Sequence, residues 1–188
     1  MGKIRIIGGT ARGRRIEVPP GPAVRPTGDR VRESLFNILQ QVVPGCRVLD
    51  AFAGSGALGL EALSRGAIHG VFIENGPGVL PTLRSNIEVL GFADVAEVWA
   101  QPVARALAGA RPQQPFDLVL ADPPYDDPGA LGFLEPLAAG GWLAPEGLVV
   151  VERERGSEGL EPPAGLRKTR SQRYGRVLLE FLEPLASS

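Results

Sequence analysis

Cysteine and histidine are almost absent from this chain of 188 residues, which contains one of each, Cys46 and His69. A single cysteine cannot form an internal disulfide, and one cysteine with one histidine cannot supply the ligand set of a typical zinc site. Long hydrophobic runs are also missing, so the sequence offers no membrane span and no signal peptide. We therefore expect a cytoplasmic protein with no resident metal ion and no membrane attachment.

The whole chain lacks a large excess of either charge, but some of its segments are strongly basic. The net charge is −1, yet residues 1–32 hold eight basic residues and two acids. A second run, "LRKTRSQRYGR" at 166–176, contains five basic residues and no acid. Arginine presents a planar fork that suits phosphate. Two such runs on an otherwise acidic protein therefore favour a polyanionic partner over a merely solvated surface.

Apolar runs alternate with short helical patterns along the middle of the chain. This alternation is typical of parallel strands buried on both faces, so the predicted fold class is α/β, with a doubly wound, mostly parallel, seven-stranded sheet. The last two strands, at 166–171 and 176–182, have no helix between them and predict an antiparallel C-terminal edge hairpin. The other strands are expected at 47–52, 70–74, 96–100, 116–122 and 147–154, and the helices between them at 57–65, 78–90, 103–109 and 129–139.

The N-terminal segment "KIRIIGGTARGRRIEV" predicts a basic β-hairpin, and the proline-rich "PPGPAVRPTG" that follows predicts a loop. Apolar residues then recur with helical spacing, with Thr27 or Asp29 as the N-cap and the Pro-Gly pair at 44 and 45 as the stop. The length suits a single domain. We predict an N-terminal extension at 1–28 and the main domain at 29–184.

A glycine-rich turn follows the first strand of the main domain. The sequence "VLDAFAGSGALGLEAL" fits G-x-G-x-x-G between a strand and a helix, and Glu74 lies 20 residues after Gly54. This pattern alone fits several nucleotide cofactors. Asp50 discriminates among them, because a carboxylate at this strand end repels a pyrophosphate and attracts a cationic amino-acid group. The combination favours S-adenosyl-L-methionine over a dinucleotide.

The second unusual stretch is "LVLADPPYDD", where an acid, two prolines and a tyrosine end an apolar strand. Two prolines stop the strand and hold a rigid corner. Asp122 and the carbonyl of Pro123 can accept hydrogen bonds from the two N–H groups of an exocyclic amine and so aim its lone pair at a methyl donor. Tyr125 offers a face on which a flipped base can stack. We therefore predict that Asp122, Pro123 and Tyr125 form the catalytic corner.

With these motifs the chain resembles the class I S-adenosylmethionine methyltransferases, and in particular the bacterial 16S ribosomal RNA guanine-N2 methyltransferases. The stretches "RIIGGTARGRRIEVP", "RPTGDRVRESLFNIL", "LDAFAGSGALGLEALSRGA" and "DPPY" are similar to that family's signatures, in its order and over nearly the whole chain. The resemblance implies a Rossmann-like methyltransferase fold. Two departures are Gln101, where the family commonly has an acid or asparagine facing the adenine, and "NGPG" after Glu74, where an acid is usual.

The residues expected at each part of the site follow from the motifs and from the resemblance. Those predicted to bind the cofactor are Thr27, Arg30, Asp50, Ala51, Phe52, Gly54, Gly56, Glu74, Gln101 and Asp122. Those predicted to contact the RNA are Arg12, Arg14, Arg15, Arg25, Arg32, Tyr125, Arg170 and Arg173.

The resulting hypothesis is transfer of a methyl group from S-adenosyl-L-methionine to the N2 amine of one guanine in 16S ribosomal RNA. The resemblance implies a monomer acting on the assembled small subunit. Methylation of another RNA, a DNA base or a protein glutamine stays open, because the proline corner alone suits any of them. A nucleotide-sensing RNA-binding module without turnover is a further alternative, and a dinucleotide oxidoreductase is disfavoured by Asp50 and by the lack of a substrate domain.

Overall fold

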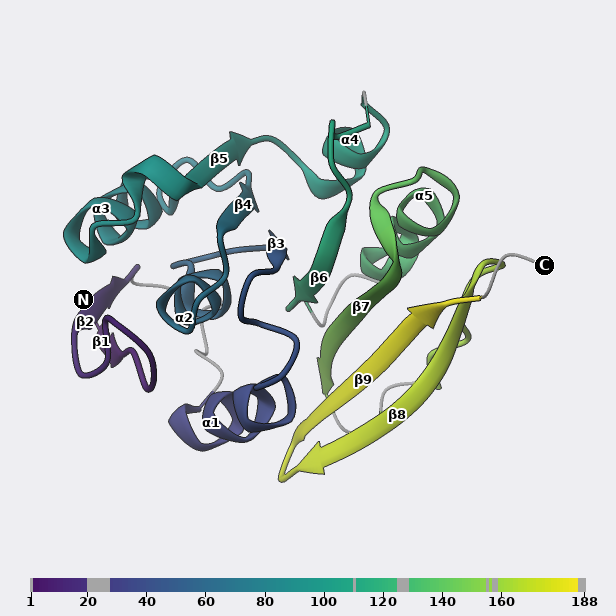
Figure 1. Ribbon diagram of the computed structural model, residues 1–188, viewed down its shortest axis with the longest axis horizontal. Helices are drawn as coiled ribbons and strands as arrows, with labels where there is room; N and C mark the ends of the chain where they lie inside the picture. The colour runs from purple at the N-terminus through teal and green to yellow at the C-terminus, as the bar shows by residue number, and fades with distance from the viewer. Residues whose placement is uncertain are drawn as a thin grey trace.

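A computed structural model describes residues 2–19, 28–109, 111–124, 129–154, 156 and 159–185 (Figure 1). Within these residues the strands are β1 (Gly2–Arg5), β2 (Arg15–Val18), β3 (Arg47–Ala51), β4 (His69–Glu74), β5 (Ala96–Ala100), β6 (Phe116–Ala121), β7 (Leu143–Glu154), β8 (Leu166–Tyr174) and β9 (Val177–Pro184). The helices are α1 (Asp29–Ile38), α2 (Ala57–Ser64), α3 (Leu80–Leu90), α4 (Val103–Leu107) and α5 (Leu134–Ala139), with 3₁₀ turns at Ala93–Val95 and Ala130–Phe133. None of these helices is long and apolar enough to cross a membrane.

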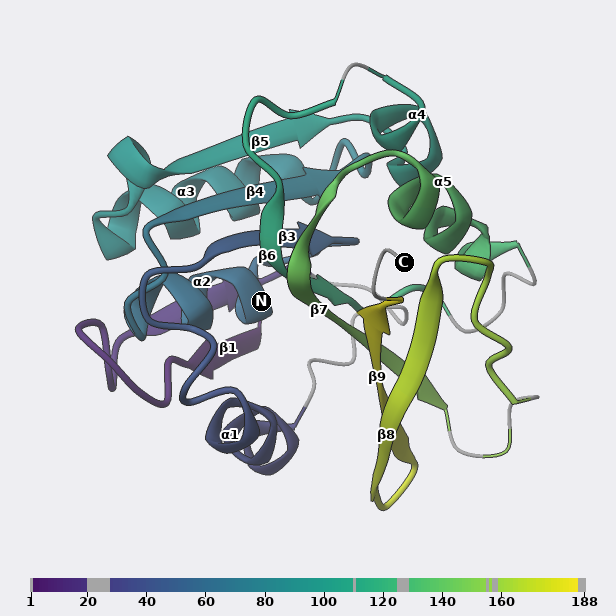
Figure 2. The ribbon, with the colours of Figure 1, turned by 45° about the vertical axis from the view of Figure 1, so that its right-hand side comes forward.

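The main sheet has the strand order β5-β4-β3-β6-β7-β9-β8. Strands β3 to β7 run parallel to one another, whereas β9 runs antiparallel to both β7 and β8. The predicted mostly parallel sheet and the C-terminal edge hairpin are therefore confirmed (Figure 2). The strand order reverses between β3 and β6, and ligands of open α/β sheets bind beyond the carboxyl ends of the strands at such a point.

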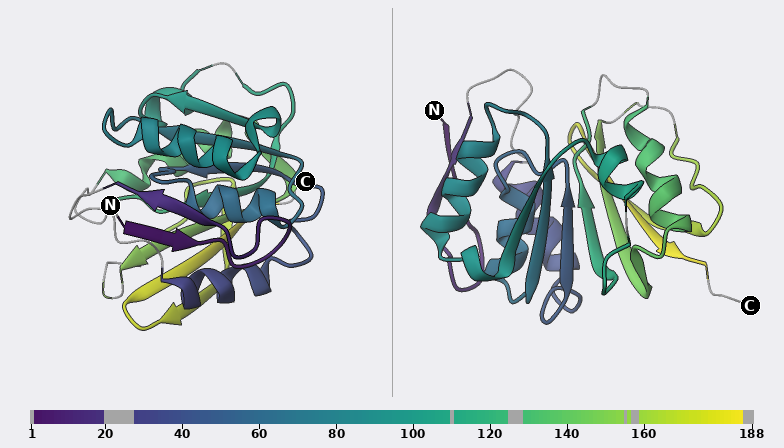
Figure 3. Two further views of the ribbon diagram at one scale, coloured as in Figure 1. Left: turned by 90° about the vertical axis from the view of Figure 1, so that its left-hand side faces the viewer. Right: turned by 90° about the horizontal axis from the view of Figure 1, so that it is seen from above.

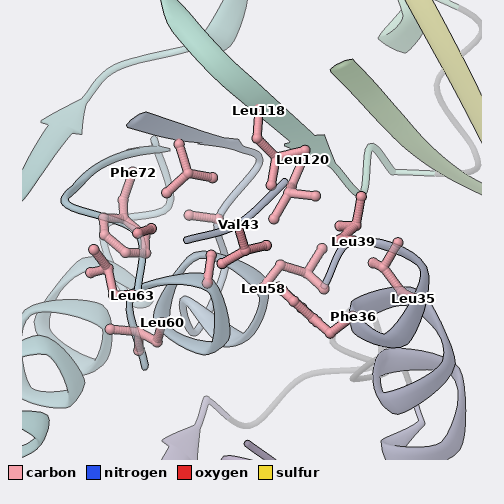
Figure 4. Close-up of a cluster of buried hydrophobic side chains, with 14 of the residues drawn as sticks. Leu35, Phe36, Leu39, Val43, Leu58, Leu60, Leu63, Phe72, Leu118 and Leu120 are labelled. Carbon is pink, nitrogen blue, oxygen red and sulfur yellow. The ribbon is translucent and has the colours of Figure 1, made fainter. Parts of the chain in front are cut away.

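Helices lie on both faces of the main sheet (Figure 3, right). A hydrophobic cluster of buried side chains fills the space on each face. One cluster joins α1, α2, α3 and the N-terminal hairpin to the face that carries Leu118, Leu120 and Val150. Figure 4 shows this cluster, in which Phe36 of α1 and Leu58 of α2 lie near Leu120 of β6. The other cluster places α4 and α5 against the opposite face. Because both faces are covered, β3 and β6 are buried along nearly their whole length.

The predicted N-terminal hairpin is confirmed, with β1 and β2 antiparallel from Gly2↔Val18 to Arg5↔Arg15. The hairpin lies across α2 and beside α3 (Figure 3, left). The Glu61 carboxylate of α2 accepts hydrogen bonds from the backbone N–H groups of Ile7 and Gly8, each at 2.8 Å. The hairpin is therefore fixed to the main body by buried polar contacts as well as by its apolar residues.

Some predicted boundaries are wrong by a turn or more. The first helix begins after Gly28, with no side-chain cap, and ends at Ile38 instead of at Pro44. The chain turns after Leu39, which brings Val43 into the first cluster and leads directly into β3. The helix predicted at 129–139 begins as a 3₁₀ turn, and β7 starts at Leu143, four residues earlier than expected.

Candidate active site

A cavity of about 550 Å³ opens beyond the carboxyl ends of β3, β4 and β6. This is the point where the strand order reverses, and the volume suits a ligand the size of a nucleotide cofactor. Its walls come from the glycine turn, the end of β4, the start of α4, the proline corner and the 3₁₀ turn before α5. The lining residues are Asp50, Phe52, Ala53, Gly54, Ser55, Ala57, Leu58, Ile73, Glu74, Asn75, Val79, Gln101, Pro102, Val103, Ala104, Asp122, Pro124, Ala130 and Phe133.

The glycine turn keeps its backbone open to the cavity. Gly54 has φ +54°, and a Cβ atom added there would meet no protein atom within 4 Å. A ligand can therefore approach the backbone at Gly54 where a side chain would otherwise stand. Phe52 also has a positive φ, 68°, which is unusual for a bulky residue and marks local strain beside the cavity. Its ring packs edge-on against Phe133, with centroids 5.5 Å apart.

Glu74 braces this turn from the end of β4. Its Oε2 accepts the N–H of Gly54 at 2.9 Å, and its Oε1 accepts the N–H groups of Asn75 at 2.8 Å and Gly76 at 2.6 Å. The carboxylate oxygens have further lone pairs, so the same group can accept hydroxyl donors from a ligand. The "NGPG" that departs from the family pattern thus has a role, because its first two N–H groups hold Glu74 in place.

Asp50 lies at the end of β3, only 2% exposed, under the glycine turn. Its Oδ2 accepts the N–H of Gly59 at 2.8 Å. Burial raises the pKa of Asp50 to about 7, with the Gly59 hydrogen bond opposing this rise and the charge of Glu74 adding to it. A nearby cation would favour the ionised form and lower this pKa.

Asp122 directly follows β6 and lines the same cavity, half-buried. Burial raises its pKa well above the usual range, and the neighbouring charges of Glu152 and Asp50 add to the rise. Pro123 is buried and Pro124 is exposed at the cavity wall. The proline corner therefore presents an acid whose surroundings disfavour negative charge. In its ionised form such a carboxylate is more basic than an exposed one, so it is a strong hydrogen-bond acceptor for a donor that reaches it.

Gln101 follows β5 and lines the cavity together with its neighbours Pro102 and Val103. Its side-chain amide can donate and accept at once, which suits the amine and ring nitrogen of an adenine. Sequence reasoning missed the apolar residues Val103 and Phe133, which also line the cavity. They belong to α4 and to the 3₁₀ turn before α5, and no local motif marks them.

Three of the described residues that were predicted to bind the cofactor do not line the cavity. Ala51 is fully buried in the cluster on the α4 and α5 face, so that prediction is wrong for its side chain. Gly56 is buried behind the turn, where its N–H bonds to the carbonyl of Ala53. Arg30 is exposed on the first turn of α1 and is not part of the cavity wall. Thr27, Arg25 and Tyr125 lie outside the described residues.

The basic residues predicted to contact RNA fall into different surroundings. Arg32 is fully buried, and its Nη2 donates to the carbonyl of Arg5 at 2.6 Å, so the prediction of an RNA contact is wrong. Arg14 is exposed but donates to the carbonyls of Val89 and Leu90 at the end of α3. The side chains that are exposed without such contacts to the fold are those of Arg12 and Arg15 on the N-terminal hairpin and of Arg173 on β8.

Arg170 and Arg173 lie on the same exposed strand but on opposite faces of the sheet. Arg170 pairs with Phe181 of β9, which belongs to the cluster on the side of α1, α2 and α3. Arg173 pairs with Leu178, three residues before Phe181, and residues an odd number of positions apart on a strand point to opposite faces. The guanidinium of Arg170 lies over the Phe181 ring, 5.6 Å from its centroid. Only Arg170 therefore shares the face on which Asp50 and Asp122 lie.

Among the described residues, no three histidine, cysteine, aspartate or glutamate side chains are placed to hold a metal ion. Cys46 is buried, and burial raises the pKa of its thiol to about 12. A thiol with this pKa is not a nucleophile near neutral pH. Within the described part of the chain, the titratable groups that line the cavity are the carboxyl groups of Asp50, Glu74 and Asp122.

Comparison with known proteins agrees with this geometry. A family model described as "Conserved hypothetical protein 95" matches residues 4–183. The ribosomal RNA small subunit methyltransferase D of Escherichia coli K12 is 44% identical over 157 residues, which cover 81% of this chain and 76% of that protein. The protein of the same name from Haemophilus influenzae is 41% identical over 155 residues, covering 82% and 80%.

Solved structures extend the similarity to the whole fold. The structure of yhhF from Escherichia coli superposes with a TM-score of 0.88 at 40% sequence identity, covering 99% of this chain and all of that one. The superposition covers both the N-terminal hairpin and the C-terminal edge hairpin, since so little of the chain is left out. The chain therefore belongs to the family described as conserved hypothetical protein 95, whose curated relatives include the ribosomal RNA small subunit methyltransferase D proteins.

Proposed function

We propose that this protein transfers the methyl group of S-adenosyl-L-methionine to the N2 amine of a guanine in 16S ribosomal RNA. The observation that carries the proposal is the position of Asp122, which lines the same cavity as the glycine turn and Glu74. A methyl acceptor held at the proline corner would then face a cofactor held at the turn. The relatives named as small-subunit ribosomal RNA methyltransferases support the reaction and the RNA, and the choice of guanine N2 rests on the family resemblance.

The cavity fits the parts of S-adenosyl-L-methionine one by one. Asp50 provides negative charge for the ammonium end, and the open backbone at Gly54 leaves room for the rest of the amino-acid group. Glu74 has lone pairs for the ribose hydroxyls, and Gln101 with Val103 would enclose the adenine. When bound, the cofactor supplies an activated methyl group on a sulfonium that leaves readily.

Catalysis by this chain would consist mainly of orientation and electrostatics. Asp122 and the carbonyl of Pro123 would each accept a hydrogen bond from one N–H of the amine, so that the nitrogen lone pair points at the methyl group. The prolines hold both acceptors rigid and spare the cost of ordering them on binding. After transfer, the surplus proton leaves to Asp122, whose raised pKa suits this role, or to solvent.

The experiment that tests this function uses S-adenosyl-L-methionine labelled in its methyl group. Small ribosomal subunits and stripped 16S RNA, both from cells lacking this activity, are incubated with the protein, and the labelled nucleoside is identified. We expect N2-methylguanosine, with assembled subunits as the better substrate. Label in another nucleoside would correct the proposed atom. No label in RNA, with cofactor binding intact, would overturn the RNA assignment and leave a DNA base or a protein glutamine as the target. We also propose that the enzyme acts as a monomer in the cytoplasm.

Cofactor affinity should depend on pH through Asp50. Its pKa of about 7 means that the carboxyl is protonated at lower pH and cannot attract an ammonium group. We therefore expect the affinity for S-adenosylhomocysteine to rise by up to about tenfold per pH unit below pH 7 and to level off above it. Calorimetric titrations between pH 5.5 and 8.5 measure this, and Asp50→Asn should flatten the profile. A wild-type profile as flat as that of the variant would contradict the ammonium contact.

The N-terminal hairpin should contact RNA phosphates through Arg12 and Arg15. Replacing both with alanine is expected to weaken RNA binding and to reduce the slope of log affinity against log salt by about 1.5, for two lost phosphate contacts. The control is the double variant Arg105→Ala, Arg111→Ala, which removes the same charge from exposed positions outside the hairpin. Equal salt slopes for the two double variants would mean that the hairpin is plain surface.

A further inference from the structure

One buried acid beside the active site, Glu152 of β7, has no part in the reaction described above. It is 4% exposed. β6 and β7 pair in parallel, with Leu120↔Val150 and Ala121↔Val151, so the next residues along the two strands are Asp122 and Glu152. Laterally paired residues point to the same face and lie roughly 4.8 Å apart at their Cα atoms. The two carboxyl groups are therefore neighbours on the face that carries Asp50.

The electrostatics of the site agree with this register. Among the charges that raise the pKa of Asp122, Glu152 makes the largest contribution, ahead of Asp50. Holding a second carboxyl group beside Asp122 disfavours ionisation of Asp122, and such an arrangement is more typical of functional sites than of a stable core. A ligand that donates two adjacent hydrogen bonds would relieve the repulsion.

The hydrogen-bonding edge of guanine has this arrangement of donors. Its ring N1–H stands next to its exocyclic N2 amine, so the edge offers adjacent donors. Adenine and cytosine carry an exocyclic amine beside a ring nitrogen that is an acceptor. If adenine or cytosine were bound, the lone pair of that ring nitrogen would face the lone pairs of a carboxylate. Neither group has a proton to donate, so both acceptors would be buried without a hydrogen bond.

We propose that Glu152 accepts the N1–H of the target guanine while Asp122 accepts an N2 proton, so that the two carboxylates together select guanine among the bases that carry an exocyclic amine. This inference rests on the proposed function and names a specificity-determining residue for it. A site that accepts a hydrogen bond from a donor on the substrate strongly rejects an analogue without that donor. This discrimination is far larger than that of an apolar site against a substrate of different shape. The choice of base would therefore come from β7, a strand that no sequence motif marks.

The test compares two bases at the target position. A 16S RNA is assembled by ligation with either guanine or 2-aminopurine at the methylated nucleotide, and kcat/KM for methyl transfer is measured on each. 2-Aminopurine keeps the amine at C2 but has an acceptor at N1. We expect the wild-type enzyme to prefer guanine by at least about 100-fold. The variant Glu152→Gln, whose amide can donate to that acceptor, should lower this preference to about tenfold or less.

Comparing the preference between enzymes cancels the effect of the 6-oxygen that 2-aminopurine lacks. Glu154→Gln is the matched control, because Glu154 lies two residues further along β7 and is exposed. It should keep the wild-type preference. Thermal unfolding and the affinity for S-adenosylhomocysteine show whether each variant is folded.

The outcomes separate the inference from the proposed function. If the wild-type enzyme methylates guanine and 2-aminopurine equally well, the role of Glu152 is wrong even if no variant folds. If Glu152→Gln folds and keeps the full preference for guanine, the role is wrong as well. If the wild-type enzyme places no label on guanine in 16S RNA at all, the proposed function itself fails, and the inference fails with it.

Discussion

Replacing Asp122 with alanine is expected to lower the rate of methyl transfer by roughly 10²- to 10³-fold, because the amine loses the acceptor that aims its lone pair. The affinity for S-adenosylhomocysteine should change by no more than about threefold, since the turn, Glu74 and Asp50 are untouched. Single-turnover rates and calorimetric binding constants measure the two effects separately. This split between rate and binding distinguishes an orienting residue from one that only maintains the cavity.

Two further variants sharpen the result. Asp122→Asn keeps one acceptor oxygen at the same place, so its rate should lie between those of the alanine variant and the wild type. Asp94→Ala removes an exposed acid from the 3₁₀ turn before β5, outside the cavity wall, and should leave the rate unchanged. Methyl transfer by Asp122→Ala within a few-fold of the Asp94→Ala rate would mean that the proline corner does not orient the amine.

The strand ends of the site could be predicted from the sequence because each is marked locally. Asp50 follows an apolar run and precedes glycines, Glu74 ends the next run at the expected spacing, and two prolines follow Asp122. Parallel strands bring such residues to one edge of the sheet whatever the details of packing. The structure places all three around one cavity, as predicted.

What the sequence could not supply depends on contacts between distant segments. Arg12 and Arg32 look alike in a basic run, yet one is exposed and the other is buried against Glu61, 29 residues away from Arg32 in the chain. Glu152 stands in "VVVERERG" as one charged residue among several. Its position beside Asp122 follows only from the order and register of β6 and β7, which a local pattern does not contain.

The buried carboxylate of Glu61 is where we expect the largest loss of stability. It accepts hydrogen bonds from the N–H groups of Ile7 and Gly8 and from Nε of Arg65 at 2.7 Å, and it lies 3.8 Å from Nε of the buried Arg32. Removing one partner of a buried charge pair typically costs about 3 to 5 kcal/mol, because the other charge stays in place without compensation. Glu61→Ala also leaves two backbone donors without their acceptor.

Thermal unfolding of Glu61→Ala should therefore occur about 10 °C below that of the wild type. Glu88→Ala is the control, because it removes an exposed helical acid on α3 and should change the free energy of unfolding by no more than about 0.5 kcal/mol. Because Glu61 ties the hairpin to α2, Glu61→Ala should also lose RNA affinity at temperatures where it still binds S-adenosylhomocysteine. Unfolding of Glu61→Ala within about 2 °C of Glu88→Ala would mean that apolar packing of Ile6 and Ile16 holds the hairpin in place without the carboxylate.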